Sequence, residues 1–176
     1  MSSESVRSLL ARTIRDSPDF PTPGVTFKDF TPLLADAQAF RTVVKDIADR
    51  YAGRVDVVAG IEARGFIIGA AVAYELGAGF VPIRKAGKLP GDTHRESYSL
   101  EYGTAEIEMQ TDALAPGVRV LVLDDVLATG GTAAAACALI ERAGEQVVAV
   151  EAILELSFLH GRRALPGREI HSLLAV

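Results

Sequence analysis

The chain has little of several features that would assign it to a special class of protein. It has a single cysteine, Cys137, among 176 residues, so no disulfide can form within it. This thiol lies in an apolar segment, and we interpret it as part of the core without a catalytic role. The N-terminus has no basic stretch followed by an apolar run, so we expect no signal peptide. These features favour a cytoplasmic protein.

Long apolar runs, an excess of basic residues and clustered histidines are missing as well. The most apolar window, residues 66–83, contains Glu75 and several glycines and is too short to cross a membrane. The net charge of −5 argues against a general nucleic-acid binder, but a local cluster of donors can still bind a small anion. His94, His160 and His171 are scattered without metal-ligand spacing, so no zinc site is predicted.

The composition, 49% hydrophobic and 23% charged, is typical of a globular domain, and we expect residues 1–176 to form one domain. Apolar spacing predicts helices, and nearly continuous apolar runs predict strands. The expected helices cover about 4–16, 37–52, 66–76 and a segment after residue 131, and the expected strands cover 55–61, 80–83, 118–126, 147–156 and 170–176. This alternation indicates an α/β fold with a central, mostly parallel sheet flanked by helices.

Two segments do not fit this alternation. Residues 84–97 are polar and rich in glycine, and we expect a long loop there. Residues 98–110 alternate in polarity and predict two antiparallel strands around Gly103. Residues 84–104 are therefore expected to form a flexible lid and hairpin.

The stretch VRVLVLDDVLATGGTA, residues 118–133, carries the strongest chemical signal. An apolar strand ends at Asp124 and Asp125, and a glycine-containing loop, residues 128–132, then opens a helix. Ligands of open parallel sheets bind beyond the carboxyl ends of the strands, and a helix N-terminus favours phosphate. The loop has no Walker A lysine and no G-x-G-x-x-G pattern, so neither of those nucleotide sites is predicted.

The two carboxylates decide between kinds of phosphate ligand. They would repel a phosphate unless hydrogen-bond donors or a cation lay between them. Ribose hydroxyls or a magnesium ion would serve, so a sugar phosphate accounts for the whole motif. An isolated pair of aspartates would be read instead as an acidic strand end beside an ordinary helix cap.

The motif closely resembles the phosphoribosyl-diphosphate-binding motif of type I phosphoribosyltransferases. Further segments resemble the adenine-specific branch of that family, in the same order along the chain. These segments are FPTPGVTFKDFTPLL (20–34), GIEARGFIIG (60–69), VPIRKAGKLPG (81–91) and SYSLEYGTAEIE (97–108). The resemblance implies the type I phosphoribosyltransferase fold, with an N-terminal hood over about residues 1–34.

The resemblance also implies roles for individual residues in the binding of phosphoribosyl diphosphate. Asp124 and Asp125 would hold the ribose hydroxyls. The 5′-phosphate would lie in the loop of Ala128, Thr129, Gly130, Gly131 and Thr132. Pyrophosphate would be bound by Ala63, Arg64 and Gly65 and by the basic cluster of Arg84, Lys85 and Lys88.

The hood would bind the base. Phe27 would stack on the purine, backbone groups of Val25, Thr26, Phe27 and Lys28 would read its edge, and Leu127 would form the second apolar wall. Glu101 on the lid would manage the purine proton, and Tyr102 would help to close the site. Arg64 and Glu101 are thus the residues expected to carry the catalysis.

The implied activity is the reaction of adenine with 5-phosphoribosyl 1-diphosphate to give AMP and pyrophosphate, with Mg²⁺ as cofactor. No side chain is assigned as a direct Mg²⁺ ligand, although Asp124 and Asp125 could contact the ion through water. The resemblance further implies a homodimer. Two alternatives stay open: a phosphoribosyltransferase for another purine, such as xanthine or guanine, and a non-catalytic regulator that senses phosphoribosyl diphosphate.

Overall fold

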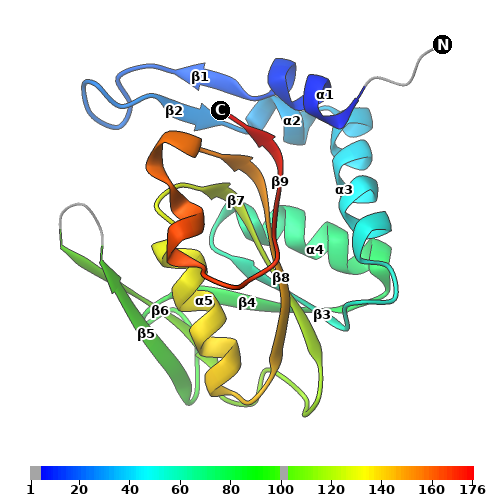
Figure 1. The fold of residues 1–176 in the computed structure, drawn as a ribbon, viewed down its shortest axis with the longest axis vertical. Coiled ribbons are helices and arrows are strands. Elements are labelled where there is room, and N and C mark those ends of the chain that lie inside the picture. The colour runs from blue at the N-terminus through cyan, green and yellow to red at the C-terminus, as the bar shows by residue number, and fades with distance from the viewer. Residues whose placement is uncertain (1–4, 100–102) are drawn as a thin grey trace.

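The computed structural model describes residues 5–99 and 103–176 and has the predicted α/β architecture. A seven-stranded sheet has the strand order β5-β6-β4-β3-β7-β8-β9, and helices cover both of its faces (Figure 1). The helices are α1 (Val6–Thr13), α2 (Thr31–Ala35), α3 (Ala37–Tyr51), α4 (Arg64–Leu76) and α5 (Gly131–Arg142). The sheet strands are β3 (Val57–Ile61), β4 (Gly79–Lys85), β5 (Thr93–Ser99), β6 (Thr104–Gln110), β7 (Arg119–Leu127), β8 (Gln146–Glu155) and β9 (Ile170–Ala175).

Strands β4, β3, β7, β8 and β9 run parallel to one another, whereas β5 and β6 form an antiparallel hairpin at one edge of the sheet. The central parallel strands β3, β7 and β8 are buried on both faces, which explains their continuous apolar sequences. One core cluster lies between the sheet and α1, α3 and α4, and the other lies under α5. Cys137 belongs to the second cluster and is fully buried, as its apolar neighbours predicted.

Local signals in the sequence set the ends of several helices as expected. Asp36 caps α3 by accepting hydrogen bonds from the amides of Gln38 and Ala39, each at 3.0 Å. Gly77 ends α4 in the left-handed conformation, with φ of 66°.

The long loop predicted over residues 84–97 is shorter in the structure. β4 continues to Lys85, and β5 already begins at Thr93, so only residues 86–92 form the connection. Strand β5 was missed because its residues, THRESYS, are mostly polar, and the strand lies at the edge of the sheet with its side chains largely outside the core. The predicted antiparallel pairing around Gly103 is confirmed, with Ser99 opposite Thr104.

The N-terminal segment lies above the carboxyl ends of the parallel strands and joins the core cluster of α3 and α4 through Leu9, Leu10, Phe30 and Leu33 (Figure 1). Strands β1 (Arg15–Ser17) and β2 (Phe27–Asp29) make a two-stranded antiparallel ribbon, flanked by α1 and α2. The C-terminal part also contributes two short 3-10 helices at this end of the sheet, η1 (Ser157–Leu159) and η2 (Gly161–Ala164).

The crossovers place a topological switch at the centre of the sheet. Strand β3 pairs with both β4 and β7, and the helices that follow β3 and β7 cover opposite faces. A crevice opens beyond the strands at such a point, and ligands of open α/β sheets bind there. The turns after β3 and β7 both lie at this crevice.

Candidate active site

The acidic pair lies at the carboxyl end of β7. The backbone N–H of Asp125 donates a hydrogen bond to Asp124 Oδ1 at 2.8 Å, which fixes the first carboxylate close to the second. Burial, and next the charge of Asp125, raise the pKa of Asp124 well above its ordinary value. Asp125 is 7% exposed, and its Oδ2 has no hydrogen-bond partner. The pair is thus set up to bind a ligand that supplies donors or positive charge.

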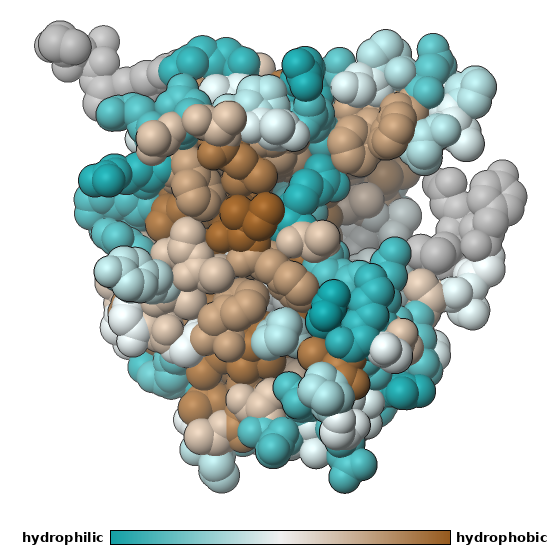
Figure 2. Space-filling model, turned by 180° about the vertical axis from the view of Figure 1, so that it is seen from behind, coloured by the Kyte–Doolittle hydropathy of each residue, from teal (hydrophilic) through white to brown (hydrophobic). Residues whose placement is uncertain are grey.

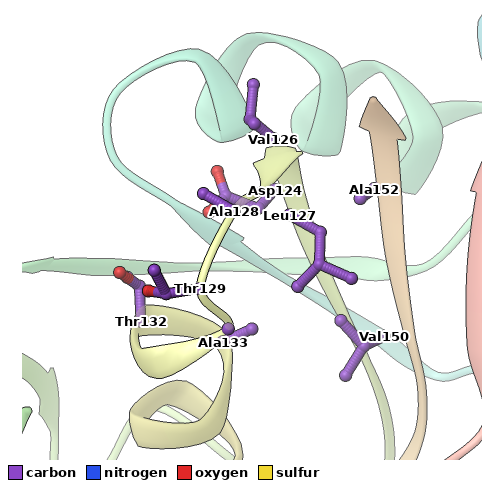
Figure 3. A pocket seen from close by; sticks show the side chains of 10 residues that line it. Asp124, Val126, Leu127, Ala128, Thr129, Thr132, Ala133, Val150 and Ala152 are labelled. Atoms are coloured by element: carbon purple, nitrogen blue, oxygen red, sulfur yellow. The ribbon is translucent and has the colours of Figure 1, made fainter. Parts of the chain in front are cut away.

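The glycine loop connects this pair to α5. Gly130 has a φ of 83°, a left-handed conformation that favours glycine, and no side chain caps the helix. The first intrahelical bond runs from Ala134 N to Gly130 O, so the N–H groups of the first turn face the loop. The cavity at this point is lined by Asp124, Val126, Leu127, Ala128, Thr129, Gly130, Thr132, Ala133, Val150 and Ala152 (Figure 3). Thr129 and Thr132 both contribute hydroxyl groups to the lining of this cavity, at the start of α5 (Figure 3). This arrangement suits a phosphate.

Arg64, the first residue of α4, joins the acidic pair to the N-terminal ribbon. Its Nε lies 2.7 Å from Asp125 Oδ2, an ion pair by distance although the N–H is not aligned as a hydrogen bond. Its Nη1 donates to the carbonyl of Lys28 at 2.8 Å. The guanidinium also lies 5.1 Å from the ring centroid of Phe27 and 5.0 Å from that of Phe30. A single side chain therefore contacts β7, β2 and the start of α2.

The ribbon closes two hollows. Phe20 packs edge-on against Phe27, with ring centroids 5.1 Å apart, and both rings line a hollow with Asp29. A larger cavity, of about 590 Å³, lies between the N-terminal segment and the region of the 3-10 helix η1. It is lined by Gly24, Val25, Thr26 and Lys28 on one side and by Leu156, Phe158 and Leu159 on the other, together with Asp16 and Val176. A flat heteroaromatic ring would fit between such walls.

This geometry is matched by known proteins. The family model described as a phosphoribosyl transferase domain matches residues 29–163. The adenine phosphoribosyltransferase of Thermobifida fusca is 57% identical over 175 residues, 99% of each chain. The chain belongs to the adenine phosphoribosyltransferase family.

Solved structures of family members agree with this assignment. The enzyme of Rhodothermus marinus superposes with a TM-score of 0.92 at 48% identity, covering 97% of this chain and 98% of that one. The enzyme of Saccharomyces cerevisiae, solved with adenine and an imino-altritol bisphosphate, gives a TM-score of 0.90 at 36% identity, covering 96% and 98%. The type I phosphoribosyltransferase fold and the recognition from sequence are confirmed.

The basic cluster expected of this family is organised by Glu62, which the sequence alone did not single out. Glu62 accepts from Lys88 Nζ at 2.7 Å, from Arg84 Nε at 3.2 Å and from the amide of Lys85 at 3.1 Å. Burial opposes ionisation, but these hydrogen bonds outweigh it and lower the pKa of Glu62. Because Glu62 directly precedes Ala63, with a cis peptide bond between them, it links the turn of Ala63, Arg64 and Gly65 to the basic cluster.

The position of the second apolar wall needs a correction. Leu127 is 2% exposed and packs in the cluster under α5, with Ala133 and Val150, rather than toward the hood. Val126 points from the opposite side of the strand and packs with the cluster that contains Phe30 (Figure 3). Side chains alternate along a strand, so an assignment displaced by one residue exchanges the two faces.

Glu101 and Tyr102 lie outside the described residues. The adjoining end of β5, however, is placed directly over the phosphate loop. A Cβ on Gly131 would lie 3.3 Å from Tyr98 Cδ2 and 3.5 Å from the carbonyl of Ser99. Arg142 of α5 donates to the carbonyl of Arg95 at 2.6 Å and pairs with Glu96. The hairpin is thus held along α5, and Tyr98 and Ser99 at the end of β5 lie against the phosphate loop.

Proposed function

We propose that this chain transfers the 5-phosphoribosyl group from 5-phosphoribosyl 1-diphosphate to adenine, forming AMP and releasing pyrophosphate in purine salvage. One observation carries the site assignment: Asp124 and Asp125 adjoin a glycine loop at a helix N-terminus, at the switch point of the sheet. The identity of 57% with an adenine phosphoribosyltransferase over 99% of the chain supports the same reaction.

In this proposal Asp124 and Asp125 accept hydrogen bonds from the ribose hydroxyls. The raised pKa of Asp124, and the ion pair that Asp125 Oδ2 makes with Arg64 Nε at 2.7 Å, support a ligand that supplies donors or positive charge. The N–H groups and hydroxyls of the loop bind the 5′-phosphate, namely those of Ala128, Thr129, Gly130, Gly131 and Thr132. The sugar is then held with its anomeric carbon toward the centre of the crevice.

Pyrophosphate leaves from the other side of the crevice. Ala63, Arg64 and Gly65 present the N-terminus of α4. Arg84, Lys85 and Lys88 supply positive charge, and Glu62 holds the side chains of Arg84 and Lys88 in place. As the bond to pyrophosphate breaks, the ribose gains oxocarbenium character and the leaving group gains charge. Donors placed in advance stabilise that charge without reorganising at the moment of reaction.

Phosphoribosyltransferases of this family generally use Mg²⁺ with the diphosphate substrate, and the residues here fit such an ion. Oxygen ligands are what Mg²⁺ prefers, and the adjacent carboxylates of Asp124 and Asp125 supply oxygens at the end of β7, where Arg64 already provides one positive charge at 2.7 Å from Asp125 Oδ2. Among residues 5–99 and 103–176, no group of three or more metal-binding side chains forms a cage. We propose that Asp124 and Asp125 hold the ion through water and the sugar hydroxyls. Bound there, Mg²⁺ supplies charge neutralisation for the diphosphate.

Adenine is proposed to lie under the hood, against Phe27. Since Val126, and not Leu127, faces this side of β7, we assign the second apolar wall to Val126. The backbone of residues 25–28 reads the edge of the base, because a purine with a 6-amino group and an N1 acceptor complements one N–H and one carbonyl. A 6-oxopurine would leave those groups unpaired, which disfavours it strongly.

Leu156, Phe158 and Leu159 extend the apolar surroundings of the base. They line the cavity opposite Gly24, Val25, Thr26 and Lys28, and the sequence had suggested no role for them. We keep Glu101 as the residue that accepts the purine proton as the bond to ribose forms. Tyr102 and the β5–β6 hairpin would close the site and exclude water, which would otherwise hydrolyse the cationic sugar.

We also propose that the protein is a cytoplasmic homodimer. In the described part of the chain no helix has the length and apolarity that a membrane span requires. Apolar side chains form a band down the face opposite to α5 (Figure 2). On α4, Ile67 is 50% and Tyr74 is 88% exposed, and a groove between α3 and α4 adjoins Tyr74. Such exposed apolar surface is usual where a second chain packs.

A comparison of four bases tests the proposal. Adenine, hypoxanthine, guanine and xanthine are each incubated with 5-phosphoribosyl 1-diphosphate and Mg²⁺, and nucleotide formation is measured. We expect adenine to be used at least about 10²-fold more efficiently than the 6-oxopurines. Preference for guanine or xanthine would identify a phosphoribosyltransferase for another purine. Binding of phosphoribosyl diphosphate without turnover of any base would support the regulator instead.

A further inference from the structure

The phosphate loop is supported from behind by a segment that sequence reasoning did not assign to the site. The 3-10 helix η2 lies against the loop that starts α5 (Figure 1). A Cβ on Gly130 would lie 2.2 Å from the carbonyl oxygen of Gly161. A Cβ on Gly161 would lie 2.3 Å from the carbonyl oxygen of Ala128. The two backbones therefore touch at a distance that only glycine on both sides permits.

Positions 161 and 130 require glycine for different reasons. Gly130 has a positive φ, so its conformation alone favours glycine. Gly161 is not among the glycines with positive φ, and any residue could adopt its conformation. The contact with Ala128 is therefore the feature of this structure that requires glycine at position 161.

Arg162 fixes Gly161 in this position. Its guanidinium donates to both carboxylate oxygens of Glu155, at 2.8 and 2.7 Å, and to the carbonyl of Ile170 at 3.0 Å. It also donates to Ser172 Oγ at 3.2 Å, and that hydroxyl donates to Glu155 at 2.6 Å. Hydrogen bonds from Arg162 lower the pKa of Glu155 against the opposing effect of burial.

These contacts cross the two outer strands of the parallel sheet. Glu155 ends β8, whereas Ile170 and Ser172 belong to β9, so Arg162 is anchored on two strands at once. Leu165, which follows η2, is 1% exposed and packs in the cluster that contains Leu127 and Ala133. The segment is therefore attached at Arg162 and Leu165, directly after the residue that touches the loop.

We propose that Arg162 is a positioning residue for phosphoribosyl-diphosphate binding, acting through Gly161 on the phosphate loop. Among the described residues that line the phosphate cavity, neither Gly161 nor Arg162 occurs, so the segment supports the loop without touching the ligand. If the segment moved away, Ala128 and Gly130 would lose the surface that holds their backbone in place. This inference rests on the proposed function, because it assigns the loop to the 5′-phosphate.

Two variants test the proposal in the full-length protein. Gly161→Ala keeps the Arg162–Glu155 pair but introduces the Cβ that collides with Ala128. Arg162→Met keeps the apolar stem but removes every hydrogen bond of the guanidinium. We expect each variant to raise the KM for 5-phosphoribosyl 1-diphosphate about tenfold or more, while the KM for adenine stays within about twofold. Arg162→Lys cannot form the bidentate pair and should restore only part of the loss.

Two control variants make the same kinds of change at positions away from the phosphate loop. Gly79→Ala adds a Cβ that would meet only ordinary contacts, the nearest at 3.5 Å, and Arg168→Met removes a second bidentate pair, with Glu141 at the far end of α5. Both controls should leave the two KM values unchanged. Equal rises in the KM for adenine and for the diphosphate, or an unchanged Gly161→Ala enzyme, would overturn the proposal. Should Arg162→Met fail to fold, Gly161→Ala decides the question.

A binding measurement separates this proposal from the proposed function. Calorimetry with ribose 5-phosphate measures the affinity of the phosphate loop for its ligand in the absence of catalysis. We expect Gly161→Ala to weaken this binding about tenfold relative to Gly79→Ala. A wild-type protein that binds ribose 5-phosphate but does not convert adenine would contradict the proposed function only. Unchanged binding in Gly161→Ala would contradict the positioning role only.

Discussion

Arg64 Nε lies 2.7 Å from Asp125 Oδ2, so the turn after β3 is tied to the acidic end of β7 across the centre of the crevice. The same guanidinium holds the carbonyl of Lys28 and lies over Phe27. We infer that Arg64 couples the positions of hood and sheet in the absence of substrate. A substrate pyrophosphate would compete for this guanidinium, since phosphate and carboxylate bind the same fork of donors.

Replacement of Arg64 by methionine should weaken the binding of both substrates. The variant loses the donors for pyrophosphate and the contacts to the hood, so we expect kcat/KM to fall about 10²-fold or more. Steady-state kinetics with both substrates varied provide the measurement. Arg54→Met is the matched control, because Arg54 also pairs with a carboxylate, Glu169 at 2.7 Å, and lies 5.4 Å from the Tyr51 ring, away from the site. Equal losses in the two variants would remove Arg64 from the mechanism.

The acidic pair should be needed for catalysis and not for folding. We expect the double variant Asp124→Asn, Asp125→Asn to lose turnover about 10²-fold or more, because amides bind the ribose hydroxyls and the nearby cation less well. Its thermal midpoint should stay at or above that of the wild type, since two adjacent buried carboxylates repel each other. Asp46→Asn with Asp49→Asn removes two charges from an exposed part of α3 and should leave turnover unchanged. Wild-type turnover in the first double variant would refute the ribose assignment.

The Glu62 contacts lead to a prediction about the leaving group. Glu62→Gln weakens the positioning of Arg84 and Lys88, so the KM for pyrophosphate in the reverse reaction with AMP should rise about tenfold. The KM for AMP should change much less. Glu141→Gln on α5 breaks a comparable ion pair, with Arg168, and should change neither the KM for pyrophosphate nor the KM for AMP. A Glu62→Gln enzyme that binds pyrophosphate normally would mean that Arg84 and Lys88 need no support.

The hood contributes to stability in a pH-dependent way through Asp29. A hydrogen bond from the Thr31 side chain, then one from its amide, and contacts with Arg15 lower the pKa of Asp29 to about 2, from 3.8. Because the folded pKa lies below the unfolded one, this contribution is present above pH 3.8 and is lost as pH falls through about 2. Urea unfolding should therefore show a stability gap between the wild type and Asp29→Asn that closes as pH falls toward 2.

The variant Asp56→Asn distinguishes an effect on the hood from a loss of overall stability. Hydrogen bonds from the Arg119 side chain and amide lower the pKa of Asp56 to about 2 as well. Asp56 directly precedes β3, at the end of the sheet opposite to the hood. Both variants should show the same loss of pH dependence. Only Asp29→Asn should raise the KM for adenine, because Asp29 holds β2 and the start of α2 together. A rise with Asp56→Asn as well would mean that global stability sets adenine binding.

Glu101, outside the described residues, keeps its predicted role as the residue that handles the purine proton. Glu101→Gln should lower kcat more than it changes the KM for 5-phosphoribosyl 1-diphosphate. Glu106→Gln on the same hairpin is the control and should leave kcat unchanged. The opposite pattern, a raised KM with normal kcat, would make Glu101 a binding residue.

The sequence by itself determined the fold class and the family, and it predicted the chemistry at the end of β7. Its signals were local or periodic: apolar runs for the buried parallel strands, Asp36 as a cap of α3, Gly77 at the end of α4, and the DDVLATGGT string. Each of these depends on residues that are close in the chain, so each can be read without knowing what packs where. The polar strand β5 escaped detection because an edge strand needs little apolar character.

Only the tertiary structure decided which side chains meet across the site. Glu62 holds Lys88, 26 residues away; Arg64 reaches Lys28, 36 residues away; and Gly161 touches the loop at Ala128 and Gly130. The choice of Val126 over Leu127 likewise depends on which face of β7 lies toward the hood. Contacts of this kind arise from the order and pairing of strands in the sheet, and no periodicity in the sequence records them.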